Sequence, residues 1–130
     1  MLKPGGCLQW GDPDFESIRI DKTRPDTKIE NLPDMLKLLS VQDPRLKPTW
    51  VTELPSLLST AGFVDSQTDK NDCPPHMAFL LHKSGLMIHE LIYRKTKNEK
   101  MKQELGRLLP QAVEETRDGA YVTAVRWTVV

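Results

Sequence analysis

The first dozen residues constrain the fold of this chain more than any other segment. They predict the end of a helix at Leu2-Lys3, a tight turn at Pro4-Gly5-Gly6, and a short apolar strand over Cys7 to Trp10. Proline cannot continue a helix, and a pair of glycines tolerates the positive φ of a sharp reversal. A domain rarely starts in the middle of a helix–turn–strand unit. We therefore expect the chain to be the second half of a larger fold.

Composition excludes several classes of protein. With 130 residues the chain is one domain at most. Lys and Arg together number 18, as do Asp and Glu, so the chain lacks the basic excess of a general nucleic-acid binder. No apolar run approaches the roughly 20 residues of a membrane span, and the first residues lack the long apolar stretch of a signal peptide. Cys7 and Cys73 lie far apart, which predicts reduced thiols and a cytoplasmic location.

The N-terminal half alternates between breakers and short apolar segments. Asp12 to Lys28 is polar and contains two prolines, which predicts a loop. Apolar spacing predicts a helix over Leu32 to Val41. It predicts another over Thr52 to Thr60, with its first threonine as the N-cap and Gly62 as the stop. Phe63 to Thr68 alternates weakly, as a strand does.

The C-terminal half predicts two longer helices and a strand. His76 to Arg94 carries two apolar stripes, so we expect a helix buried on two sides. The first stripe is Met77, Leu80, Leu81, Ser84, Met87, Ile88 and Leu91, and the second is Phe79, His82, Leu86, His89 and Tyr93. Asn98 should cap the next helix, which Pro110 should kink or restart. Tyr121 to Val130 is the longest strand signal.

Three segments together resemble class I S-adenosylmethionine-dependent methyltransferases, most of all the small-molecule enzymes of fungal secondary metabolism. The first segment is Leu2-Lys3-Pro4-Gly5-Gly6 followed by Leu8-Gln9-Trp10-x-Asp12. The second runs from Pro48-Thr49-Trp50 through Leu54-Pro55 and Leu58 to Gly62-Phe63. The third is the final strand, Gly119 to Val130. They occur in the family's order and with plausible spacing across nearly the whole chain.

The resemblance implies a fold. It makes residues 1–130 one partial α/β domain of the Rossmann-like methyltransferase class, with four to five helices and a three-stranded mixed sheet. In the family the last three strands are neighbours, and the final one lies antiparallel between the other two. Residues 75–118 would be a helical insertion before that strand which covers the substrate.

The resemblance also implies S-adenosylmethionine as cofactor, but this chain carries only the substrate side. In the family the cofactor lies on a glycine-rich loop after the first strand. This sequence contains no G-x-G-x-G, and Gly5-Gly6 precedes a strand instead of following one. We therefore expect no binding residues for the cofactor here, and no binding by this chain alone. The acceptor would be a small molecule held beyond the carboxyl ends of the strands.

Trp10, Asp12 and Asp14 are the first candidates for binding that substrate, since they follow the first expected strand. Trp10 could form an aromatic wall and a carboxylate could orient a polar acceptor group. The alternative is that Trp10 fills the core and Asp12 caps a turn before Pro13.

The histidines of the long helix are the candidates for catalysis. His76 or His82 could act as general base toward a hydroxyl, because imidazole titrates near neutrality. Met77, Phe79, His89 and Tyr93 would line an aromatic pocket beside them. The alternative places these residues in a helix–helix contact or the core. His82 and His89 are about 10.5 Å apart along a helix, which excludes their sharing one metal ion, and we expect no metal.

Three functional readings remain open from the sequence. The chain is the substrate half of a methyltransferase, or a cofactor-free binding protein, isomerase or cyclase that kept the pocket, or an inactive remnant. We expect its first strand, Cys7 to Trp10, to leave an unpaired edge. That edge would recruit either an N-terminal methyltransferase half or a second copy of the chain. No nucleic acid or membrane partner is expected.

Overall fold

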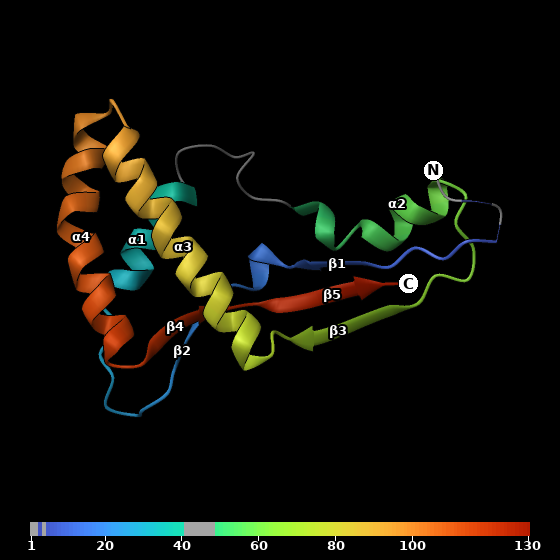
Figure 1. The fold of residues 1–130 in the computed structure, drawn as a ribbon, viewed down its shortest axis with the longest axis horizontal. Coiled ribbons are helices and arrows are strands. Elements are labelled where there is room, and N and C mark those ends of the chain that lie inside the picture. The colour runs from blue at the N-terminus through green and yellow to red at the C-terminus, as the bar shows by residue number, and fades with distance from the viewer. Residues whose placement is uncertain (1–2, 4, 41–48) are drawn as a thin grey trace.

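The computed structural model describes residues 3, 5–40 and 49–130 of the chain. It is a mixed α/β structure, with a cluster of helices at one end and a narrow sheet extending from it (Figure 1). The elements, in order, are β1 (Trp10–Pro13), η1 (Phe15–Ser17), β2 (Arg19–Lys22), α1 (Asn31–Ser40), η3 (Thr49–Val51), α2 (Leu54–Thr60), β3 (Thr68–Asp72), α3 (Pro75–Lys95), α4 (Glu99–Arg117), β4 (Ala120–Thr123) and β5 (Val125–Val129).

Two small sheets share the C-terminal strand segment. In the first sheet β5 lies between β1 and β3 and is antiparallel to both, with Trp10 opposite Val129 and Thr68 also opposite Val129. The expected position of the final strand is therefore confirmed. The second sheet pairs β2 with β4. Every strand pairing in the described residues is antiparallel, so the expectation of a mixed sheet was wrong.

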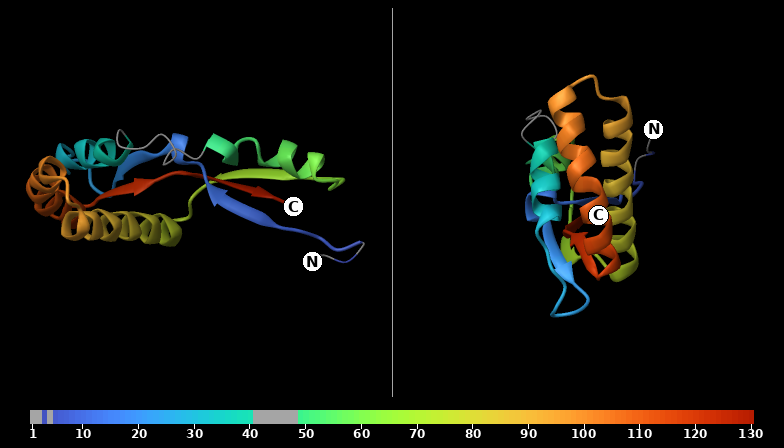
Figure 2. Two further views of the ribbon diagram at one scale, coloured as in Figure 1. Left: turned by 90° about the horizontal axis from the view of Figure 1, so that it is seen from above. Right: turned by 90° about the vertical axis from the view of Figure 1, so that its left-hand side faces the viewer.

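The helices form the main core at one end of the molecule. α4 packs against α1 on one side and α3 on the other, and α3 also packs on β4. Figure 2 shows α3 and α4 side by side, and α2 on the face of the three-stranded sheet opposite to α3. The buried residues of the core are Leu32, Met35, Met101, Leu105, Leu108, Ala112 and Ala120. None of the described helices is both long enough and apolar enough to cross a membrane.

Local sequence explains where the long helices begin. Asn98 accepts a hydrogen bond from the amide of Met101 at 3.1 Å, the N-cap that the sequence predicted. Pro110 lies inside α4, but the helix continues to Arg117 and does not restart. α3 begins at Pro75. Proline is favoured at the first position of a helix, because the N–H group it lacks would have no partner within the helix. α1 begins at Asn31.

A carboxylate from another element caps α1. Glu115 on α4 accepts hydrogen bonds from the amides of Glu30 and Asn31 at one oxygen and from the amide of Leu32 at the other. These are unpaired donors of a helix N-terminus, and a negative charge is favourable there. Burial alone would raise the pKa of Glu115, but the hydrogen bonds from Asn31, Leu32 and Glu30 outweigh it and lower the pKa.

Several expected elements lie elsewhere in the structure. The first strand is Trp10–Pro13, and residues Cys7 to Gln9 are outside it. The expected loop over Asp12 to Lys28 contains η1 and β2. The strand expected over Phe63 to Thr68 is instead Thr68–Asp72, because pairing with β5 and not local apolar pattern defines it.

Two further expectations were wrong. The single long strand over Tyr121 to Val130 divides at Ala124, because its two parts pair in different sheets. α2 begins at Leu54, and its N-cap residue is Glu53 in place of Thr52, whose hydroxyl donates to the carbonyl of Thr49. Gly62 does follow the end of α2, with a φ of +92°. Val41 and Pro48 lie outside the described residues.

Only one side of α3 is buried. Ala78, His82 and His89 face the interior, whereas the stripe that contains Leu80 and Met87 faces outward. The expectation of burial on both sides was therefore wrong. Nothing in the described chain packs over this outer stripe.

Candidate functional site

His82 joins three elements in the interior. Its Nδ1 accepts a hydrogen bond from the amide of Val122 on β4 at 3.2 Å. That contact requires the proton on Nε2, which lies 2.8 Å from the hydroxyl of Thr116 on α4. Thr116 in turn donates to the carbonyl of Ala112. Burial and, to a lesser extent, the charge of Lys83 lower the pKa of His82, so the neutral ring is favoured.

The surroundings of His82 favour a structural role over catalysis. His82 is 2% exposed, and both nitrogens of its ring have protein partners. A general base needs a nitrogen that reaches the substrate, and here that nitrogen faces the amide of Val122.

His89 is also buried and connects α3 with α1. Its Nδ1 lies 2.7 Å from the carbonyl of Gly85, and its Nε2 lies 3.2 Å from the carbonyl of Met35. Both neighbours are acceptors, so a neutral ring donates to one of them at a time. This position in a helix–helix contact leaves His89 away from any surface that a substrate could reach.

The other predicted residues of α3 do not converge on a pocket. His76 is exposed in the first turn of the helix, and Phe79 is exposed on its outer side. Tyr93 lies half-buried against α4, where a Cβ on Gly106 would come within 3.3 Å of its ring. Met77 faces β5, and its sulfur accepts a hydrogen bond from Arg126 at 3.6 Å.

Trp10 and Asp12 do form a unit on β1. The indole N–H of Trp10 donates to the carboxylate of Asp12 at 3.1 Å. Trp50 of η3 contacts Trp10 edge-to-face, with the ring centroids 6.1 Å apart and an interplanar angle of 83°. Both rings remain partly open to solvent, at 42% and 37% exposure. Asp14 is not part of this unit, because its carboxylate caps η1 through the amide of Glu16.

Trp127 extends the same face across the sheet. Directly opposite residues of antiparallel strands project to the same face, and Trp127 is opposite Asp12 on one side and Lys70 on the other. The Lys70 ammonium lies 3.6 Å above the centre of the Trp127 ring, a cation–π contact. All three tryptophans of the chain therefore belong to one surface, which we call the tryptophan face: Trp10, Asp12, Trp50, Lys70 and Trp127.

The tryptophan face is the strongest candidate site in the described part of the chain. Flat apolar rings and one carboxylate suit an aromatic small molecule with a polar or cationic group. Among the described residues no group of His, Cys, Asp and Glu side chains is arranged to hold a metal ion. Sequence reasoning missed Trp50, Trp127 and Lys70. Only the strand register brings them together, although the rarity of tryptophan was a usable signal.

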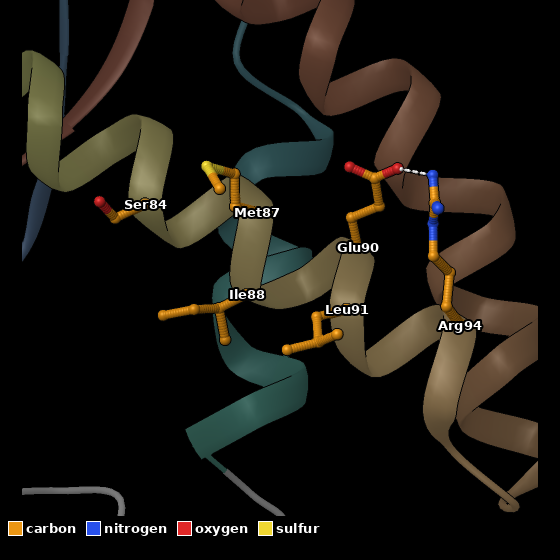
Figure 3. Close-up of a pocket in the computed structure, with 6 residues that line it drawn as sticks. All are labelled: Ser84, Met87, Ile88, Glu90, Leu91 and Arg94. Atoms are coloured by element: carbon orange, nitrogen blue, oxygen red, sulfur yellow. Dashed lines mark hydrogen bonds and ion pairs between the residues drawn. The ribbon is translucent and has the colours of Figure 1, made fainter.

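An open hollow lies elsewhere, along the outer side of α3 (Figure 3). Its lining residues, Ser84, Met87, Ile88, Glu90, Leu91 and Arg94, all belong to this one helix. A single helix cannot enclose a small molecule, so this is an open surface and not a pocket.

Comparisons with known proteins found no relative of this chain. No protein-family model matches the chain, and neither the curated proteins nor the solved structures gave a match.

Proposed function

We propose that this chain is the substrate-binding half of an S-adenosylmethionine-dependent methyltransferase that acts on a small molecule of secondary metabolism. One observation carries the proposal. The final strand β5 lies antiparallel between β1 and β3, the arrangement that the resemblance of the sequence implies. The Rossmann-like assignment of the fold belongs to the same proposal.

The tryptophan face is where the acceptor would bind. Trp10 and Trp50 supply the aromatic wall, and Asp12 orients the acceptor group through its carboxylate. The Asp12 oxygen that accepts from Trp10 is fixed by that contact, and a carboxylate has further lone pairs for a substrate donor. Holding the acceptor in one orientation toward the methyl group is the main task of such a site.

The cofactor would be held by an N-terminal half with a glycine-rich loop. β1 is an edge strand in the described sheet, so its free side is open to a strand of that half. The edge is Trp10–Pro13, and Pro13 limits it because proline has no N–H to donate.

Methyl transfer in trans tests the proposal. The chain is combined with the N-terminal half of a methyltransferase of the resembled family, radiolabelled S-adenosylmethionine and a panel of phenols, indoles and amines. We expect labelled product only with both halves present, and a strong loss with Asp12→Asn. A folded complex that binds the cofactor but methylates nothing in the panel would contradict the proposal.

A cofactor-free binding protein is the second candidate, because the tryptophan face is built without a glycine-rich loop in the chain. Intrinsic fluorescence reports on this face directly, since all three tryptophans belong to it. Quenching by an aromatic amine without cofactor, weakened by Asp12→Asn but not by Asp14→Asn, would favour this reading. Equal quenching of both variants would argue against a site at Asp12.

A further inference from the structure

The outer side of α3 is an uncovered apolar surface in the described structure. Five large apolar side chains on it are each more than half exposed: Phe79 at 59%, Leu80 at 62%, Met87 at 69%, Ile88 at 51% and Leu91 at 57%. Scattered apolar residues on a surface are ordinary, but an apolar surface that runs along one helix marks an interaction site. The described chain supplies no element that covers it, as Figure 1 shows for the front of α3.

Part of this surface has the spacing of a helix-pairing seam. Leu80, Ser84, Met87, Leu91 and Arg94 follow one another at alternating intervals of four and three residues. That repeat keeps one stripe of a helix facing another helix along its length. α3 has 21 residues, or three heptads, and Ser84 near its middle allows a close approach of two backbones.

The charges beside the seam identify the partner. Lys83 precedes Met87 by four residues and Glu90 follows it by three, on the same side of the row. When two copies of α3 pack antiparallel with Met87 on the two-fold axis, Lys83 of each copy lies beside the partner's Glu90. Such contacts between opposite charges flank the seams of antiparallel helix pairs and select orientation.

The existing contacts of these two side chains are compatible with that packing. The Lys83 ammonium lies 5.4 Å above the ring of Phe79, so it already lies along the outer side of the helix. Glu90 binds Arg94 through one oxygen, as the dashed line in Figure 3 marks, and its other oxygen makes no hydrogen bond to any of the described residues.

We propose that the outer side of α3 binds the same surface of a second copy of this chain, antiparallel, with Met87 on the two-fold axis and Lys83 paired with the partner's Glu90. A two-fold contact of this kind closes on itself and gives a dimer. The proposal does not rest on the methyltransferase function. It also differs from pairing through the β1 edge, which would leave α3 uncovered.

Charge reversal tests the partner and the orientation. Lys83→Glu and Glu90→Lys each place like charges together twice per dimer, and the double variant restores opposite charges. By light scattering over a concentration series we expect a mass near twice 14.8 kDa for the wild type. Each single variant should dissociate about tenfold more readily, and the double variant should recover. Both side chains are at the surface, so circular dichroism should be unchanged.

Crosslinking tests whether Met87 lies on the two-fold axis of the dimer. In a background with Cys7→Ser and Cys73→Ser, Met87→Cys should be joined between copies by a short bis-maleimide. Leu80→Cys should not, because antiparallel packing separates its two copies by about 21 Å along the helices. Crosslinking of both would overturn the antiparallel arrangement. A wild-type monomer at high concentration, or a dimer unaffected by Lys83→Glu and not crosslinked at Met87, would overturn the proposal.

Discussion

The carboxylate of Glu115 accepts hydrogen bonds from both the backbone amide and the side-chain amide of Asn31, at 2.7 Å and 2.8 Å. The two residues are 84 positions apart in the sequence. This contact caps the N-terminus of α1 and links α1 to α4. The start of the first helix therefore depends on a residue near the end of the last one.

Replacing Glu115 by Gln should destabilise the fold strongly. The amide keeps the shape but loses the charge, and its NH₂ group would face backbone donors. We expect the free energy of unfolding to fall by about 2–3 kcal/mol in urea. Glu114→Gln is the matched control, because Glu114 pairs with Arg117 at the surface. It should cost less than about 0.5 kcal/mol. Similar losses for both variants would refute the capping role.

The same contact predicts how stability depends on acid. The folded pKa of Glu115 is lowered below its ordinary value of 4.5. Its contribution is therefore complete above that pH and is lost as the pH falls through the folded pKa. Unfolding free energies measured from pH 6 to pH 2 should decline less steeply in Glu115→Gln than in the wild type. Parallel curves would show that Glu115 titrates alike in both states.

His82 predicts a second, milder dependence on pH. Because its folded pKa is lowered from 6.5, the folded protein binds fewer protons than the unfolded chain as the pH falls below about 6.5. Stability should therefore decrease on going from pH 7.5 to pH 5. His82→Gln should flatten that part of the profile and cost about 1–3 kcal/mol at pH 7.5. Identical pH profiles for the wild type and His82→Gln would contradict the assignment.

Gly119, in the turn between α4 and β4, should tolerate no side chain. Its φ is +106°, and a Cβ there would clash with the hydroxyl of Thr23. Gly62 is the matched control, with a φ of +92° and open space around it. Alanine at Gly62 should cost about 1 kcal/mol from backbone strain alone, and at Gly119 about 2–4 kcal/mol. Thermal unfolding of both variants measures the difference, and equal costs would exclude the clash.

The sequence predicted best those features that depend on residues close together in the chain. The Asn98 cap and the spacing of Met101, Leu105 and Leu108 defined α4, since each signal lies within a few residues of its effect. β3 carries no such signal. All of its residues, Thr68 to Asp72, are polar or charged and exposed, and only their pairing with β5 makes them a strand.

The candidate site was predictable only in part for the same reason. Trp10 and Asp12 are two residues apart and were paired from the sequence. Their neighbour Trp127 joins them through a register between strands more than a hundred residues apart. His82 forms its hydrogen bonds with Val122 and Thr116. These partners lie on other elements, so the apolar spacing of the helix around His82 could not predict them.

The sharing of one C-terminal segment between both sheets has a consequence for synthesis of the chain. Each strand pair in the described structure includes β4 or β5. While a ribosome is still translating the helices, β1, β2 and β3 have already emerged but have no strand to pair with. The strands of the nascent chain can pair only after residues 120–129 have been synthesised. Until then, the segments of β1, β2 and β3 would be unpaired and accessible to chaperones.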